Sequence, residues 1–280
     1  MPDSFIEKLK NKWNEGKFVC VGLDGDYNLL PKSVKDGSKE TSIFNFNKAI
    51  IDSTSDLVSA YKPQVAHYEE AGLDGWSALS KTIKYLNESC PDIPVILDAK
   101  RGDIGATNKH YSKAIFDNLG FDAVTVNPYL GKESLEPFLT YKNKGIIILV
   151  RTSNPGAKEI QDLVIEGEGA PLYQHLAKII ASDWNYNHNC GVVVGSTYPE
   201  ELKKVREIIG DMPILIPGIG TQGGDLEAAV KNGINSQKQG IIISSSRSII
   251  YASSGEDFAE AARIETEKLH NQITNILHDQ

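Results

Sequence analysis

The stretch "VILDAKRGDIGATNKHY", residues 95–111, joins a short apolar run directly to a cluster of charged side chains. Val95, Ile96 and Leu97 are typical of a buried strand. Asp98 and Lys100 follow at once. Charges at the end of a buried strand are costly unless they pair with one another or serve a site.

Seven further runs of this kind occur along the chain. With "PVILDAK" (94–100), they are "FVCVGLD" (18–24), "VSAYKPQ" (58–64), "AVTVNPY" (123–129), "GIIILVRT" (145–152), "CGVVVGS" (190–196), "PILIPGIG" (213–220) and "GIIISSSR" (240–247). Continuous Val and Ile without strict alternation is typical of parallel strands that are buried on both faces. Segments with helical spacing, such as "YPEELKKVREIIG", lie between the runs.

Eight strand–helix units close naturally into a (β/α)₈ barrel, an α/β fold. We predict one such barrel as a single catalytic domain over residues 1–280, preceded by a short N-terminal helix. A doubly wound open sheet is the alternative. It would leave two of the runs unplaced, and no GxGxxG motif follows the first strand.

The composition is that of an ordinary soluble protein, with 40% hydrophobic and 24% charged residues among 280. A net charge of -8 argues against a nucleic-acid or anionic membrane partner bound through a broad basic face. The first 18 residues lack the apolar core of a signal peptide, and no later run approaches the roughly 20 residues of a membrane span. We expect a cytoplasmic protein that acts on a small molecule.

The cysteines and histidines do not suggest a metal site. The three cysteines include no CxxC pair, and the six histidines show no HExxH spacing. No cofactor-binding motif is present either. We therefore expect no disulfide framework, no metal and no cofactor.

Polar side chains recur at the carboxyl ends of the predicted strands, where such barrels carry their active sites. They are Asp24, Lys62, Asp98, Lys100, Asp103, Asn127, Ser153, the loop "PGIGTQGGD" (217–225) and Arg247. Taken singly, each has an ordinary explanation, since a strand-end Asp is often a helix cap and a lone Lys is usually solvated. Together we expect them to build one site.

The spacing DxKxxD is the most informative part of this set. Asp98 and Lys100 are two apart on a strand, so we expect both to face the barrel mouth, with Asp103 in the loop that follows. Lys62, Asp98, Lys100 and Asp103 alternate in sign and can neutralise one another in a row. The alternative is a structural ion-pair network.

A second cluster lies late in the chain. The glycines of "PGIGTQGGD" allow backbone N–H groups to approach a ligand closely, and the eighth run ends in Arg247. The loops after strands seven and eight are the usual phosphate site of such barrels. A flexible glycine-rich turn is the alternative, but the arginine favours phosphate binding.

These motifs resemble those of the orotidine 5'-phosphate decarboxylase family. "DAKRGDIGATN" (98–108) is similar to that family's signature, and "SNPGA" (153–157), "PGIGTQGGD" and "SSSRSIIYA" (244–252) resemble its later motifs in the right order. The chain length and the insertion before "APLYQHLA" (170–177) resemble the longer-chain branch. Ser245 and Ser246 depart from the Val-Gly pair that much of the family carries before the arginine.

The resemblance implies cofactor-independent decarboxylation of orotidine 5'-phosphate to uridine 5'-phosphate in de novo pyrimidine biosynthesis. Lys100 would protonate C6, with Asp98 and Asp103 in an alternating charge network that includes Lys62. The implied substrate contacts are Asp24 and Lys62 to the ribose, Ser153 to the pyrimidine edge, Gln222, Gly220 and Arg247 at the phosphate, and Asp103 and Thr107 reaching into the neighbouring subunit of a homodimer.

Two rival functions stay open. A magnesium-dependent aldolase or decarboxylase acting on sugar phosphates shares DxKxxD, but such enzymes carry an acidic residue on the second strand where this chain has Lys62. A non-catalytic protein that binds phosphoribosyl ligands is the other. It would not need both Lys100 and its two flanking carboxylates.

Overall fold

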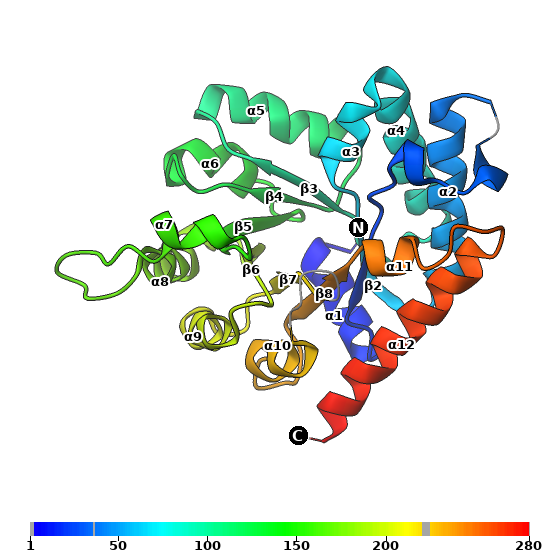
Figure 1. Ribbon diagram of the computed structural model, residues 1–280. Helices are drawn as coiled ribbons and strands as arrows, with labels where there is room; N and C mark the ends of the chain where they lie inside the picture. Colours follow the sequence, from blue (N-terminus) through cyan, green and yellow to red (C-terminus); the bar gives the residue numbers. More distant parts are fainter. Residues whose placement is uncertain (1–2, 36, 220–224, 280) are drawn as a thin grey trace.

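The computed structural model describes residues 3–35, 37–219 and 225–279, and eight parallel strands form its central sheet (Figure 1). The strands are β1 (Val19–Gly22), β2 (Val58–Lys62), β3 (Ile96–Arg101), β4 (Ala123–Val126), β5 (Gly145–Arg151), β6 (Cys190–Val194), β7 (Ile214–Pro217) and β8 (Ile241–Ser245). Seven of them lie within the predicted runs, and β3 extends one residue beyond its run, to Arg101.

The sheet runs in the order β2-β1-β8-β7-β6-β5-β4-β3. The two end strands, β2 and β3, are joined by parallel bridges between Tyr61 and Val95 and between Gln64 and Asp98. These bridges complete the circuit, so the predicted (β/α)₈ barrel is confirmed. Because all the strands are parallel, their carboxyl ends meet at one mouth.

Helices alternate with the strands and surround them (Figure 1). The α-helices are α1 (Phe5–Asn14), α2 (Lys39–Thr54), α3 (Val65–Glu70), α4 (Gly72–Ser89), α5 (Gly105–Lys113), α6 (Lys132–Leu139), α7 (Lys158–Gln161), α8 (Leu172–Ile179), α9 (Pro199–Ile209), α10 (Leu226–Gly233), α11 (Arg247–Ile250) and α12 (Phe258–His278). Short 3₁₀ turns lie at Tyr27–Leu29, Lys32–Val34 and Pro155–Ala157, and π-helical turns at Ala114–Asn118 and Ile180–Trp184.

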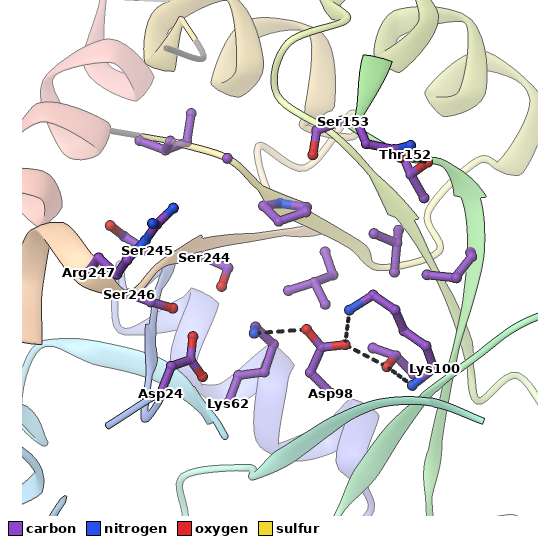
Figure 2. Close-up of a pocket in the computed structure, with 18 of the residues that line it drawn as sticks. Asp24, Lys62, Asp98, Lys100, Thr152, Ser153, Ser244, Ser245, Ser246 and Arg247 are labelled. Atoms are coloured by element: carbon purple, nitrogen blue, oxygen red, sulfur yellow. Dashed lines mark hydrogen bonds and ion pairs between the residues drawn. The ribbon is translucent and has the colours of Figure 1, made fainter. Parts of the chain in front are cut away.

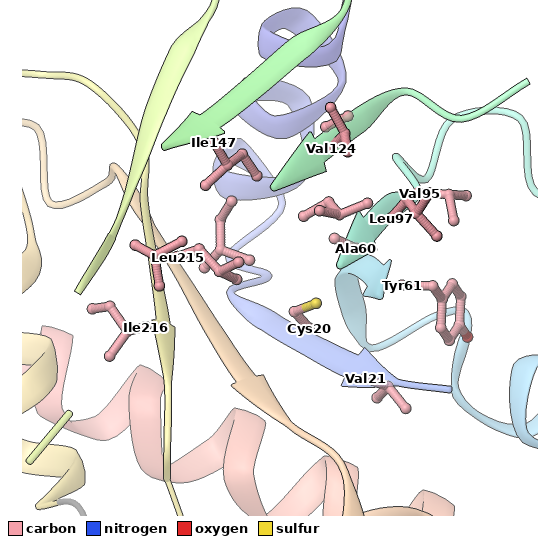
Figure 3. Close-up of a cluster of buried hydrophobic side chains, with 14 of the residues drawn as sticks. Cys20, Val21, Ala60, Tyr61, Val95, Leu97, Val124, Ile147, Leu215 and Ile216 are labelled. Carbon is pink, nitrogen blue, oxygen red and sulfur yellow. The ribbon is translucent and has the colours of Figure 1, made fainter. Parts of the chain in front are cut away.

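The barrel core consists of the strand side chains themselves. Apolar residues from opposite sides of the barrel, such as Cys20, Leu97 and Ile147, are buried together (Figure 3). Val and Ile dominate because their branched side chains pack well on a strand that is covered on both faces.

Helix α1 covers the amino ends of the strands. Ser4 and Glu7 form a capping box at its start, with Ser4 N donating to Glu7 Oε2 at 2.7 Å. Trp13 Nε1 donates to the carbonyl oxygen of Ile241, the first residue of β8, at 2.9 Å. This end of the barrel is therefore closed, and the opposite, carboxyl end is left for a site.

The connection between β5 and α8 is the long insertion recognised in the sequence. It contains the short helix α7 and then a segment, pinned by an antiparallel bridge between Val164 and Pro171, that projects from the barrel wall (Figure 1). Its start lies beside the barrel mouth, which places it next to the site described below.

Candidate active site

A cavity of about 530 Å³ opens at the carboxyl ends of the strands. The predicted site residues that line it are Asp24, Lys62, Asp98, Lys100, Ser153 and Arg247. They come from the ends of β1, β2, β3, β5 and β8, so the fold brings together residues that are more than 200 positions apart (Figure 2).

Asp98 is the centre of a charged row in this cavity. Its Oδ2 accepts from Lys62 Nζ at 3.1 Å, and its Oδ1 accepts from Lys100 Nζ at 2.7 Å (Figure 2). Thr125 Oγ1, from β4, donates to the same Oδ1 at 2.8 Å. The carboxylate is thus held in place by two cations and one hydroxyl.

Lys62 and Asp98 stay charged at neutral pH although both are largely buried. Burial disfavours the Lys62 ammonium, but the carboxylates of Asp98 and Asp24 outweigh that effect and hold the pKa of Lys62 above its ordinary value. Burial likewise opposes ionisation of Asp98, yet Lys62 and Lys100 hold the pKa of Asp98 below its ordinary value. The cavity therefore presents fixed charges to a ligand.

Lys100 has an unusual backbone. Its φ is 47°, in the left-handed region that is uncommon for residues other than glycine, and the register of β3 against β4 shifts between Leu97 and Arg101. The prediction assumed a regular strand, whereas the two side chains reach the same cavity across an irregularity. Lys100 N donates to Thr125 Oγ1 at 2.9 Å, which supports this conformation. Strained backbone of this kind concentrates at functional sites.

Asp24 follows β1, close to the point where the ends of β1 and β8 pack against each other. Its Oδ1 accepts from Gln64 N at 2.9 Å, which ties it to the end of β2. A Cβ on Gly22 would lie 1.8 Å from Ser246 Oγ, so only glycine allows this approach. Asp24 and Arg247 thereby line the same cavity.

Other predicted residues do not line this cavity. The Asp103 side chain turns back on its own loop, where Oδ1 accepts from Ile104 N at 2.7 Å, and Thr107 lies on α5. Within one chain the charged row therefore ends at Lys100. Asn127 is exposed, and its side chain supports a turn by accepting from Tyr129 N at 3.1 Å. Gly220 and Gln222 lie outside the described residues.

Several cavity residues were missed in the sequence, namely His67, Thr125, Thr152, Asn154 and Ser244. Thr125 carried a weak signal, since it is the polar residue inside an otherwise apolar strand run. Asn154 and Ser244 lie within the quoted motifs SNPGA and SSSRSIIYA but were not singled out, and His67 and Thr152 have no distinguishing neighbours in the sequence.

Over residues 3–35, 37–219 and 225–279, no helix combines the length and apolar character needed to cross a bilayer. Over the same residues, no three His, Cys, Asp or Glu side chains gather where they could hold a metal ion.

A family model described as "Orotidine 5'-phosphate decarboxylase / HUMPS family" matches residues 18–263. The chain belongs to this family. It is 50% identical over 271 residues to the orotidine 5'-phosphate decarboxylase of Cellvibrio japonicus, covering 96% of this chain and 98% of that protein. It is 48% identical to the Janthinobacterium enzyme of the same name, covering 93% and 94% of the two chains.

A solved structure of Leishmania donovani OMP decarboxylase is also similar. The TM-score is 0.82 at 33% identity, over 97% of this chain and 99% of that one. The family resemblance predicted from the sequence motifs is confirmed, as is the prediction that the chain is an enzyme, a carboxy-lyase.

Proposed function

We propose that this chain converts orotidine 5'-phosphate to uridine 5'-phosphate and CO₂ without a cofactor, as a step of pyrimidine biosynthesis. The observation that carries the proposal is the alternating row Lys62–Asp98–Lys100 in the cavity, with Arg247 on the same cavity wall. The family and the identity of about one half to decarboxylases of that name support it.

Lys100 is proposed to carry the chemical step. Loss of CO₂ from C6 of the base leaves a carbanion that no neighbouring carbonyl delocalises in the usual way. The Lys100 ammonium stabilises this developing charge and then donates its proton to C6. Its side chain is 45% exposed, so a substrate can reach it, whereas Lys62 and Asp98 are held behind it in the cavity wall.

Asp98 is proposed to face the substrate carboxylate. Two like charges about 4 Å apart repel by about 4 kcal/mol at an effective dielectric near 20, and departure of CO₂ relieves this repulsion. The ion pairs to Lys62 and Lys100 keep Asp98 ionised, which is the state that this role requires.

The other cavity residues are assigned to the rest of the substrate. Asp24 and Lys62 bind the ribose hydroxyls, Ser153 the pyrimidine edge, and Arg247 with Gln222 and Gly220 the phosphate. Binding energy from the phosphate, remote from C6, then contributes to closure over the base and to catalysis there.

The direct test of the proposed function is the change in ultraviolet absorbance when orotidine 5'-phosphate is added to catalytic amounts of protein. Absence of turnover would instead favour a non-catalytic protein that binds phosphoribosyl ligands.

We expect turnover to survive complete removal of metal ions by a chelator. Lys62 is buried at the place where the magnesium-dependent relatives carry an acidic residue, and its ammonium repels a divalent cation. The measurement is the same absorbance assay with and without the chelator. Loss of turnover that magnesium restores would instead favour the aldolase-like rival.

Arg247→Ala is expected to lower kcat/KM for orotidine 5'-phosphate by about 100-fold, because charge-assisted hydrogen bonds to the phosphate are lost. The wild-type protein and the variant should decarboxylate orotidine, which lacks the phosphate, at nearly equal rates. The matched control is Arg263→Ala, since Arg263 pairs with Asp56 and does not line the cavity. Equal losses on both substrates would remove the phosphate assignment.

We also propose an obligate-type homodimer with shared active sites, in which the partner subunit's Asp103 and Thr107 complete the row. Exposed apolar side chains near Asp103 and Thr107 support a subunit contact beside the barrel mouth. They lie in the segments that follow the neighbouring strands β3, β4 and β5, and are Ile104, Tyr129, Leu130, Ile160, Leu163 and Val164. Clustered apolar exposure of this kind marks interaction surfaces.

A further inference from the structure

Arg151, the last residue of β5, is a fully buried cation, with 0% of its side chain exposed. Its guanidinium pairs with Asp162: Nη2 donates to Oδ2 at 3.2 Å, and Nε lies 3.1 Å from Oδ1 without a hydrogen bond between them. The ring of Tyr198 covers one face of the guanidinium, with Cζ 3.9 Å from the ring centroid. A buried arginine with this many partners has a fixed position.

Gln161 connects this ion pair to Thr152. Its Oε1 accepts from Thr152 N at 2.9 Å and from Arg151 Nη1 at 3.3 Å, and its Nε2 donates to Thr152 Oγ1 at 2.9 Å. Arg151 Nη1 also donates to the Thr152 carbonyl at 3.2 Å. The backbone N–H, the carbonyl and the hydroxyl of Thr152 are therefore all held by these two side chains.

The held segment is a wall of the cavity. Thr152 and Ser153 line it (Figure 2), as does Asn154. Thr152 Oγ1 in turn holds Asn154 by donating to its Oδ1 at 2.7 Å. Ser153 is also confined from the side of β6, because a Cβ on Gly195 would lie 2.7 Å from the Ser153 Cβ. Arg151, Gln161 and Asp162 themselves do not line the cavity.

We propose that Arg151, Gln161 and Asp162, here called the β5 clamp, are positioning residues that fix Thr152–Asn154 as the surface recognising the pyrimidine base. The inference rests on the proposed function. It also gives a role to the start of the insertion: without the clamp, the long loop between β5 and α8 would be free from its first residue, and ordering it on binding would weaken affinity. Specific recognition needs contact groups held within about 0.5 Å, which backing hydrogen bonds provide.

Two variants test the β5 clamp without emptying the core. Asp162→Asn removes the charge that holds Arg151, and Gln161→Ala removes the link to Thr152 while the ion pair stays. Both residues are only partly buried. The ligands are uridine 5'-phosphate and ribose 5-phosphate, which differ by the base. In each variant we expect Kd for uridine 5'-phosphate to rise about tenfold and Kd for ribose 5-phosphate to stay within about twofold.

The matched control is Asp56→Asn. Asp56 accepts two hydrogen bonds from Arg263, at 2.6 and 2.8 Å, in an Arg–Asp pair on the exposed outer surface. It should change neither Kd. A purely structural role of the β5 clamp would weaken both ligands equally, and that result would overturn the inference, as would unchanged discrimination in both clamp variants. Wild-type protein that binds the two ligands equally would overturn the proposed function, and the clamp's role with it.

Discussion

Lys100→Ala is expected to lower kcat for orotidine 5'-phosphate by about 10⁴-fold, because one substitution removes both the cation beside the carbanion and the proton donor. Binding of uridine 5'-phosphate should change by less than about tenfold, since the remaining contacts lie elsewhere in the cavity. The measurements are single-turnover decarboxylation and ligand titration. A variant that retains a tenth or so of the wild-type rate would remove Lys100 from the chemical step.

A rescue experiment separates lost chemistry from lost structure. Lys100→Cys in a Cys90→Ser background can be alkylated with 2-bromoethylamine, which restores an ammonium through a thioether. Burial raises the pKa of the Cys20 and Cys190 thiols to about 12, so they should stay protonated and unreactive in the native protein. Alanine and cysteine meet the same left-handed backbone as lysine at φ 47°. We expect activity to return in this variant and not in Lys100→Ala treated in the same way.

The fold could be predicted because its signal is repeated. Runs such as "CGVVVGS" and "GIIILVRT" are apolar throughout, and this is what burial on both faces requires of a parallel strand. The convergence of the candidate site residues could be predicted for a related reason. Parallel strands place their carboxyl ends at one mouth, so Asp24, Lys62, Asp98 and Arg247 had to converge once the barrel was correct.

What the sequence did not reveal depends on conformation rather than on residue type. The left-handed backbone of Lys100 follows from a local shift of register, and no residue pattern signals that shift. Thr125 looks like an ordinary strand residue until its hydroxyl is seen against Asp98. Arg151 ends an apolar run like any solvated arginine, and its burial depends on Asp162, which lies in the insertion.

Composite active sites should show themselves by complementation between two inactive variants, Lys100→Ala and Asp103→Ala. Within one chain the Asp103 side chain turns away from the cavity, and its carboxylate accepts from Ile104 N. Lys62, Asp98 and Lys100 alone carry two positive charges and one negative. The partner subunit's Asp103 would make the row neutral, which a site that excludes water favours.

A mixed dimer of the two variants should contain one intact active site. In a heterodimer of the two variants, one site receives both lesions, and the other combines an intact Lys100 with an intact Asp103. Random exchange of subunits at equal concentrations makes about half of the dimers mixed, so about a quarter of the wild-type sites should be restored in a twofold-symmetric dimer. Activity is measured by absorbance after reassociation, with exchange followed by mass labelling of one variant. The control is each variant taken through dissociation and reassociation alone. Exchange without recovery would mean that Asp103 serves its own subunit, and the shared site would have to be abandoned.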